Sequence, residues 1–261
     1  MSNQTRTAFF ISGTGTTVEA VIKASKKNKL GGIIPTLVLS SNKNASGLEK
    51  AKALGVPTVL VEKNDFKTSE QFGEAILQIC NGFSIELISN NGWIPYTPKN
   101  VIDAYRGRII NQHPGPLDPG RGTDFGGKGM YGIRVIAARM IYEWLTDANS
   151  PWTEATIHFV TETLDEGDLI RTKKVTVPKP KQKITIDDIR NNTTIQQYIH
   201  DTVIDFQKHF LPIEHQNVIE SLQLFATGKK PKGYQRETPL ITPGNKNLLD
   251  ESKRLAIQFF Q

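Results

Sequence analysis

The sequence predicts an α/β protein with a Rossmann-like, mostly parallel sheet that carries helices on both faces. Short apolar runs alternate with stretches of helical period from the first residues onward, which is typical of βαβ units. The runs are nearly continuous in apolar residues, as expected for strands that are covered on both sides. We therefore expect ligands to bind beyond the carboxyl ends of the strands, where open sheets of this kind place their sites.

The predicted elements follow one another without an internal repeat. In the first half, strands are expected at 7–12, 33–40, 57–61, 85–89 and 108–111, with helices at 18–26, 45–54 and 70–80. In the second half, a helix is expected at 133–145, strands at 153–161 and 169–177, and one or two helices within 186–225. We expect a catalytic domain at 1–226 and a helical carboxy-terminal extension at 227–261, where the sequence is polar and punctuated by Pro and Gly.

A glycine-rich stretch separates the two halves, between Leu117 and Gly132. So many glycines cannot form a stable helix, because glycine loses more backbone freedom on folding than any other residue. The stretch therefore predicts a loop whose backbone bends tightly or approaches a ligand.

The composition favours a soluble protein with anionic ligands. The 261 residues include 32 Lys and Arg against 26 Asp and Glu, a formal net charge of +6. The single cysteine, Cys80, allows no intramolecular disulfide and no cysteine-type zinc site. The first residues lack the pattern of a signal peptide, and no apolar run approaches the ~18 residues of a membrane span. We expect a cytoplasmic monomer or homodimer that binds no membrane and, because its positive charge is scattered, no nucleic acid.

Three polar side chains that could handle protons follow predicted strands. Asn111 and His113 lie two residues apart at a strand end, so their side chains point to the same side, and Asp165 follows a later strand. An amide, an imidazole and a carboxylate together could hold an oxyanion and move a proton during acyl transfer. Taken singly, a strand-end histidine is more often structural, and Asp-Glu-Gly is an ordinary turn. His158, inside an apolar run, fits a core histidine as well as a supporting role in the site.

A turn of glycine and threonine, from Ser12 to Thr17, follows the first strand. Backbone N–H groups at the start of the next helix would favour a phosphate or carboxylate there. The turn lacks the third glycine of the dinucleotide fingerprint and the Gly-Lys-Ser/Thr ending of a nucleotide P-loop. An ordinary turn capped by Thr16 is the equal alternative.

Taken together, the motifs resemble the phosphoribosylglycinamide formyltransferase family. Their order and spacing agree with the family across 7–177, apart from the glycine-rich loop, and the likeness rests on 12–16, 41–51, 55–58, 107–114, 156–160 and 164–170. The resemblance implies the folate-dependent formyltransferase fold and a reaction that needs no metal.

The resemblance implies transfer of a formyl group from 10-formyltetrahydrofolate to the primary amine of phosphoribosylglycinamide, in de novo purine biosynthesis. Asn111 would donate to the tetrahedral oxyanion, His113 would assist proton transfer, and Asp165 would orient His113. The family's other site positions correspond here to substrate binding by Gly15, Thr16, Thr17 and Glu214 and to folate binding by Trp93, Ile94, Pro95, Tyr96 and Leu164. A solvated helix face is an equal interpretation of Glu214 and its neighbour His215.

Several departures from the family concern the acceptor. Thr17 stands where the family has an asparagine, and Ile94 to Tyr96 replace a segment that carries an arginine. The glycine-rich loop is longer than in the family. Arg121 or Lys128 could supply the missing cation, although a solvated surface charge is the plainer interpretation of both. An N-formyltransferase acting on a nucleotide-linked amino sugar would explain these changes and is the alternative function.

Other functions fit the sequence less well. Methionyl-tRNA formyltransferase would need a further carboxy-terminal domain, for which the ~80 residues after Val177 leave no room beside the predicted helices. A formyltetrahydrofolate hydrolase would need a regulatory amino-terminal domain. A binding protein that kept the fold and lost the activity would tolerate Asp165→Asn, whereas an enzyme would not.

Overall fold

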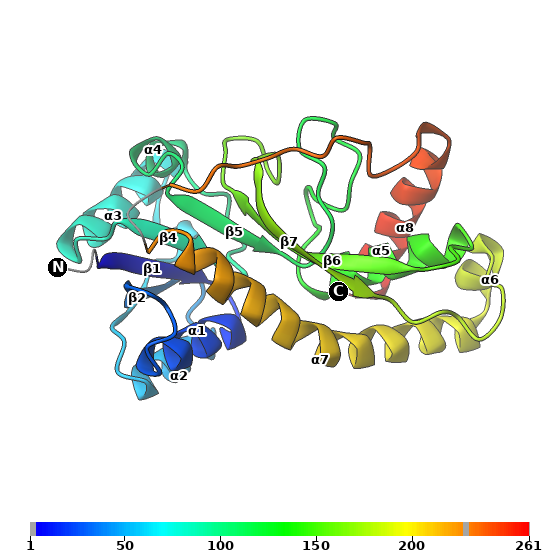
Figure 1. Cartoon of the computed structure of the whole chain (residues 1–261), viewed down its shortest axis with the longest axis horizontal. Coiled ribbons are helices and arrows are strands. Elements are labelled where there is room, and N and C mark those ends of the chain that lie inside the picture. The colour runs from blue at the N-terminus through cyan, green and yellow to red at the C-terminus, as the bar shows by residue number, and fades with distance from the viewer. Residues whose placement is uncertain (1–3, 227–229, 261) are drawn as a thin grey trace.

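The computed structural model describes residues 4–226 and 230–260 and contains a seven-stranded sheet with helices on both faces (Figure 1). The strand order is β3-β2-β1-β4-β5-β6-β7; β1 to β5 are parallel, and β6 is antiparallel to both of its neighbours. The strands are β1 (Thr5–Ile11), β2 (Ile33–Ser40), β3 (Thr58–Leu60), β4 (Leu87–Asn90), β5 (Ile109–His113), β6 (Trp152–Phe159) and β7 (Leu169–Thr176). The predicted α/β fold class is confirmed.

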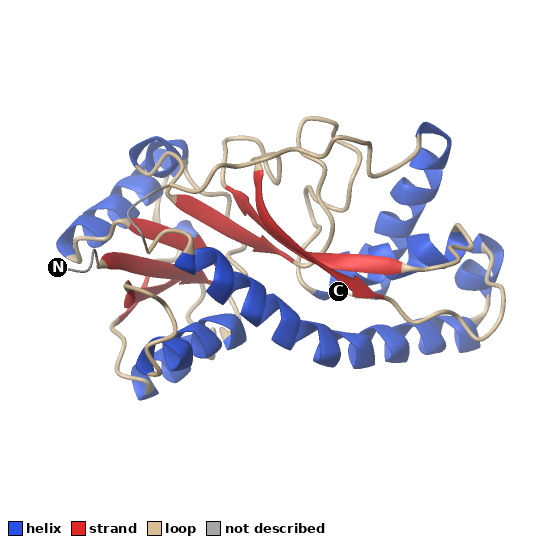
Figure 2. Cartoon of the chain, in the orientation of Figure 1, coloured by secondary structure: helices blue, strands red, loops and turns tan. Residues whose placement is uncertain are grey.

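The helices follow the prediction with one addition. They are α1 (Thr16–Lys26), α2 (Gly47–Ala53), α3 (Ser69–Gly82), α4 (Lys99–Ala104), α5 (Ile133–Leu145), α6 (Ile186–Asn191), α7 (Thr193–Gln223) and α8 (Lys246–Phe259), with short 3-10 turns η1 (Lys63–Asp65) and η2 (Pro243–Asn245). Helix α4 was not predicted, α8 lies in the extension that was predicted to be helical, and the stretch 186–225 forms two helices. Between β5 and α5, which the structure describes in full, the glycine-rich stretch forms no helix or strand (Figure 2).

The first strand shows how the sheet separates two apolar cores. Successive side chains of a strand point to opposite faces. Phe9 and Ile11 enter the core that α1 and the end of α7 cover, and Ala8 and Phe10 enter the core that α3 and α4 cover. The apolar run in the sequence therefore reflects burial on both sides.

Helix α7, of 31 residues, connects these cores to a third. Its first half packs with α5, α6 and α8 through residues such as Val203 and Phe210, and its second half reaches the core around α1 through Val218 and Leu222. The helix runs along the sheet for much of its length (Figure 1). Glu214 lies between the two halves, where α7 passes the ends of the central strands.

The segment 230–260 packs against the second half of the sheet. Tyr234 forms an antiparallel bridge with Leu169, and α8 lies along α5. The predicted domain boundary between 226 and 227 adjoins residues 227–229, which lie outside the described residues, as does residue 261, so the division into two parts stays a prediction.

Two properties of the whole chain follow from the helices and cores. In the described ranges, none of the helices combines the length and the apolar character that crossing a lipid bilayer requires. Cys80 on α3 is fully buried, and burial raises the pKa of its thiol to about 12.

Candidate active site

The turn after β1 brings backbone N–H groups to the open edge of the sheet. Gly15 is the N-cap of α1, with a φ of 62°, and no side chain in the described residues caps this helix. A Cβ on Gly15 would lie 2.7 Å from the Cα of Gly47, so only glycine allows the two segments to approach this closely. The alternative with Thr16 as the cap is wrong, because Thr16 is already the first residue of the helix. The first turn of α1 can therefore receive an anion on its backbone N–H groups.

Ser12 ties this turn to the loop that follows β4. Its Oγ accepts a hydrogen bond from the backbone N–H of Ile94 at 2.9 Å. Behind the loop, the ring of Trp93 stacks on Phe72 with centroids 6.1 Å apart, which fixes the backbone from the core side. Ile94 and Tyr96 remain 52% exposed and present apolar surface. The loop thus combines a fixed backbone with unpartnered apolar side chains.

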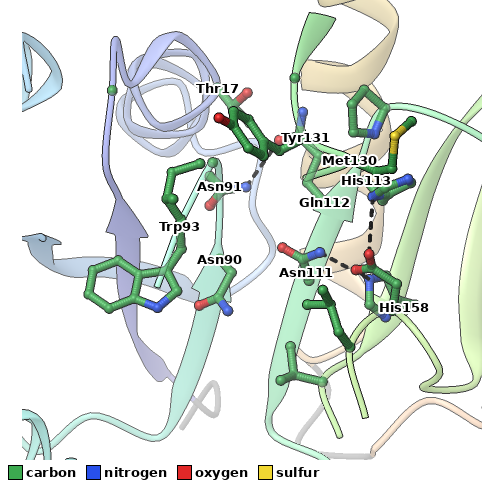
Figure 3. A pocket seen from close by; sticks show the side chains of 18 of the residues that line it. Thr17, Asn90, Asn91, Trp93, Asn111, Gln112, His113, Met130, Tyr131 and His158 are labelled. Carbon is green, nitrogen blue, oxygen red and sulfur yellow. Dashed lines mark hydrogen bonds and ion pairs between the residues drawn. The ribbon is translucent and has the colours of Figure 1, made fainter. Parts of the chain in front are cut away.

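His158 orients Asn111 through the register of β5 and β6. The two residues are paired in the antiparallel ladder. Nδ1–H of His158 donates to the carbonyl of Phe159 at 2.8 Å, so Nε2 of the neutral ring accepts from Nδ2 of Asn111 at 3.0 Å (Figure 3). Burial lowers the pKa of His158 against the opposing effect of Asp165, which favours this neutral ring. The second N–H of the Asn111 amide is left to donate elsewhere.

Backbone groups of the glycine-rich loop hold His113 and Asp165. Nε2–H of His113 donates to the carbonyl of Phe125 at 3.1 Å, and since a carbonyl only accepts, the neutral ring carries its proton on Nε2. Nδ1 then faces Oδ2 of Asp165 at 4.0 Å. The same Oδ2 accepts from the N–H of Gly127 at 2.8 Å, and Oδ1 lies 3.7 Å from Nε2 of His158. The carboxylate therefore lies between two imidazoles.

Gln112, between Asn111 and His113, points to the opposite face of β5 and contacts α7. Its Nε2 donates to Oε1 of Glu214 at 2.7 Å. Its Oε1 accepts from Nδ2 of Asn91 at 3.2 Å (Figure 3). Oδ1 of Asn91 in turn accepts from the hydroxyl of Ser89 at 3.0 Å. Each group donates to the next, and the chain of hydrogen bonds ends on the carboxyl of Glu214.

Glu214 is the most strongly desolvated carboxyl of the site. Only 3% of the residue is exposed, so its interpretation as part of a solvated helix face is wrong. Within the described residues, Gln112 is its one hydrogen-bond partner. Burial raises the pKa of Glu214 to about 7, and the bond from Gln112 opposes this rise. The group is poised to change its charge near neutrality.

Asn111, His113, Asp165 and Glu214 border one cavity of about 450 Å³. Every site residue predicted from the sequence lines it: Gly15, Thr16, Thr17, Trp93, Ile94, Pro95, Tyr96, Asn111, His113, Leu164, Asp165 and Glu214. His158, Asn91, Gln112 and Tyr131 line it as well. Sequence reasoning assigned no role to the last three, although the position of Gln112 between two candidate residues at a strand end was a signal. The individual roles of the predicted residues stay predictions.

Lys128 and Arg121, the two cations considered as replacements for the family's arginine, lie in different places relative to the cavity. Lys128 is the one lysine or arginine that lines the cavity in the described part of the chain. Arg121 does not line it, because its guanidinium binds the carboxylate of Asp118 at 2.6 Å and the carbonyl of Arg236 at 2.9 Å. Arg121 is an exposed residue whose guanidinium is held by these two partners, and the idea that it contacts a ligand in the cavity is wrong.

The fold and the site define an α/β protein with an acid–base centre at the open edge of its sheet, an arrangement suited to acyl transfer. Comparison with known proteins gives the family. The model of the formyl transferase family matches residues 5–202, and the chain belongs to this family.

Several relatives are named for purine biosynthesis. The phosphoribosylglycinamide formyltransferase of Bacillus subtilis (strain 168) is 27% identical over 194 residues, which cover 74% of this chain and 86% of the relative. The trifunctional purine biosynthetic protein adenosine-3 of Gallus gallus is 28% identical over 227 residues, 87% of this chain but only 19% of that protein. This chain therefore spans about a fifth of the trifunctional relative.

Solved structures share the fold. Glycinamide ribonucleotide transformylase 1 from Symbiobacterium toebii superposes with a TM-score of 0.68 at 22% identity, over 91% of this chain and 96% of the other. Phosphoribosylglycinamide formyltransferase from Brucella melitensis gives a TM-score of 0.65 at 26% identity, over 87% and 98%. The likeness extends over nearly the whole of both solved chains.

Proposed function

We propose that the protein transfers the formyl group of 10-formyltetrahydrofolate to the primary amine of phosphoribosylglycinamide. The observation that carries this proposal is the convergence of Asn111, His113 and Asp165 on one cavity in a chain of the formyl transferase family. The names of the relatives support this choice of acceptor. The same site chemistry would serve any primary amine that fits the cavity, and the acceptor therefore needs direct testing.

The proposed chemistry is an addition followed by an elimination. The amine nitrogen attacks the formyl carbon, and the carbonyl oxygen takes the electron pair as an oxyanion. The free N–H of Asn111 stabilises this charge, and His158 keeps the amide in place. The carbon–nitrogen bond to the folate then breaks as the oxyanion collapses, and the folate nitrogen takes up a proton.

His113 and Asp165 manage that proton. Nδ1 of His113 is the unprotonated nitrogen of the neutral ring, so it accepts a proton from the attacking amine. Asp165, 4.0 Å away, stabilises the imidazolium that forms. His113 then returns the proton toward the leaving nitrogen. No covalent enzyme intermediate takes part.

Two ends of the cavity suit the two substrates. The N-terminus of α1, at Gly15 to Thr17, offers backbone donors to the phosphate of the acceptor. The carboxyl of Glu214, which lines the same cavity, can accept a hydrogen bond from an N–H or O–H group of the acceptor. The exposed side chains of Ile94, Tyr96 and Leu164 offer apolar surface to the pterin ring of the folate.

The proposal is tested by a formyl-transfer assay. We would measure turnover of 10-formyltetrahydrofolate with phosphoribosylglycinamide, with a panel of nucleotide-linked amino sugars, and without acceptor. Formylation of phosphoribosylglycinamide that disappears in His113→Ala is the expected result. Formylation of an amino sugar alone would reject this acceptor and establish the alternative, and folate consumption without acceptor would indicate a hydrolase.

A further inference from the structure

Two segments that the formyltransferase motifs do not explain pack against each other. The glycine-rich loop 118–132 contacts the carboxy-terminal segment 230–260, which runs past it on the way to α8 (Figure 1). The N–H of Leu240 donates to the carboxylate of Asp118 at 2.8 Å, and the guanidinium of Arg236 donates to the carbonyl of Leu117 at 2.7 Å. The longer loop and the segment that follows α7 are thus one structural unit.

The loop carries the backbone groups that hold the acid–base residues. The carbonyl of Phe125 fixes the tautomer of His113, and the N–H of Gly127 fixes the carboxylate of Asp165. Gly126, between them, packs so tightly that a Cβ there would lie 2.8 Å from the Cβ of Asp165. A small shift of these three residues would therefore change the surroundings of both His113 and Asp165.

Lys253 on α8 anchors this part of the loop. Its ammonium donates to the carbonyl of Asp124 at 2.9 Å, one peptide unit before Phe125. The carboxylate of Asp124 accepts from the N–H of Gly126 at 2.8 Å, which closes the turn around the same peptide. The side chain is partly buried, and burial lowers the pKa of Lys253 against the opposing carboxylates of Asp124, Asp250 and Asp165. A partly buried cation aimed at one carbonyl is a specific contact rather than a solvated charge.

We propose that Lys253 is a positioning residue, and that through it the segment 230–260 holds Phe125 and Gly127 in the places that His113 and Asp165 require. A glycine-rich backbone has many alternative conformations, so a loop of this composition needs an external anchor to stay in one of them. Lys253 supplies that anchor from α8. The effect on turnover rests on the proposed formyl transfer, whereas the effect on the imidazole of His113 does not.

The first test is kinetic and uses the full chain. Lys253→Met is expected to lower kcat by ~10-fold or more, because small displacements of catalytic groups are costly, while KM for 10-formyltetrahydrofolate stays within about twofold. Lys253→Arg, which can still donate to the Asp124 carbonyl, is expected to restore most of kcat. The matched control is Arg190→Met, which removes another cation bound to α8, at Glu251 2.9 Å away, without touching the loop. Arg190→Met is expected to keep kcat near that of the unmodified protein.

The second test needs no acceptor. The chain has five histidines, so the imidazole nitrogens of His113 can be assigned by nuclear magnetic resonance through the loss of its signals in His113→Ala. The unmodified protein is expected to show the proton on Nε2, and Lys253→Met a mixture of both tautomers. An unchanged tautomer in Lys253→Met, or an equal loss of kcat in Arg190→Met, would overturn the proposal. A changed tautomer in a protein that formylates none of the acceptors would support it and reject only the proposed function.

Discussion

The two faces of β5 hold their polar side chains in opposite ways. On one face, Asn111 is fixed by His158, which a backbone carbonyl holds in turn, and His113 is fixed by a backbone carbonyl directly. On the other, Gln112 leads a chain of side-chain amides to Glu214, whose carboxyl has a single partner in the described residues and a pKa that burial raises to about 7. The first face is organised before any ligand arrives. The second face holds the buried carboxyl of Glu214, whose protonation state a bound ligand can change.

The largest effect on this difference between the two faces is expected from removing the imidazole of His113, on the face that is organised before a ligand binds. His113→Ala is expected to lower kcat by ~10³-fold, because it removes the proposed proton acceptor, with little effect on the KM of either substrate. Steady-state kinetics on both substrates measures this, with circular dichroism to verify the fold. A loss of affinity at undiminished kcat would contradict the assignment of His113 to chemistry.

Asp165→Asn removes charge from the same face and keeps its shape. Asp165 has a φ of 59°, a left-handed conformation that asparagine tolerates, and the amide oxygen can still accept from Gly127. We expect kcat to fall ~10²-fold because the imidazolium of His113 loses its counter-charge. The melting temperature should stay close to that of the unmodified protein. Turnover unaffected by this change would contradict the role of Asp165 in stabilising the imidazolium of His113.

Glu214→Gln tests the second face through stability. Because the folded-state pKa is raised from 4.5 to about 7, the folded protein holds a proton that the unfolded chain loses first. The stability that Glu214 contributes is therefore fully present below pH 4.5 and is lost as pH rises to about 7. We expect the free energy of unfolding of Glu214→Gln, relative to the unmodified protein, to rise by ~3 kcal/mol across that window. Urea unfolding at both ends of the window measures it, and a constant difference would show that Glu214 is not desolvated.

Gln112→Leu changes the second face of β5 and leaves the first face unchanged. It removes the donor that Glu214 has among the described residues, while leaving Asn111 and His113 on the other side of the strand. The lost bond should raise the pKa of Glu214 above its present value, and we expect kcat/KM for the acceptor amine to fall ~10-fold. KM for 10-formyltetrahydrofolate should not change. The pH profile of acceptor KM tests the cause, since a merely structural defect would lower activity equally at every pH.

Lys128→Met should have the smallest effect, because the side chain is exposed at the cavity edge. Both proposed substrates are anionic, so we expect the KM of each substrate to rise ~3-fold at low salt. The difference in KM between the variant and the unmodified protein should shrink as salt screens the charge. Lys67→Met, which removes an exposed lysine that does not line the cavity, is the matched control. An equal effect from Lys67→Met would show that Lys128 acts only through the net charge of the protein and not through its place at the cavity.

The fold was readable from the sequence where local pattern and tertiary role agree. The apolar run of β2 was predicted at its observed bounds, and that of β1 within two residues, because burial on both faces leaves an uninterrupted signal. The carboxy-terminal extension was predicted to be helical, but the bounds of α8 within it were not, because its polar sequence is stabilised by packing on α5 rather than by its own pattern. The antiparallel direction of β6 was also not specified, since side-chain alternation does not encode strand direction.

The site, like the fold, could be predicted from the sequence only in part. Asn111, His113 and Asp165 carry recognisable chemistry in their side chains and could be proposed from the sequence alone. The partners that hold them are the carbonyl of Phe125 and the N–H of Gly127, and such groups are present on nearly every residue. Gln112 meets Glu214 across 102 positions of the chain, and only the passage of α7 over the strand ends makes them neighbours.

The burial of Cys80 gives the protein a practical property. The thiolate is the reactive form of cysteine, and a fully buried thiol with a pKa of about 12 offers almost none at neutral pH. Since Cys80 is the single cysteine of the chain, a second one introduced by Lys128→Cys would be labelled alone by a thiol-directed fluorophore. A dye at that position, on the loop that supplies the partners of His113 and Asp165, would report the arrival of each substrate by its emission, without altering any other residue.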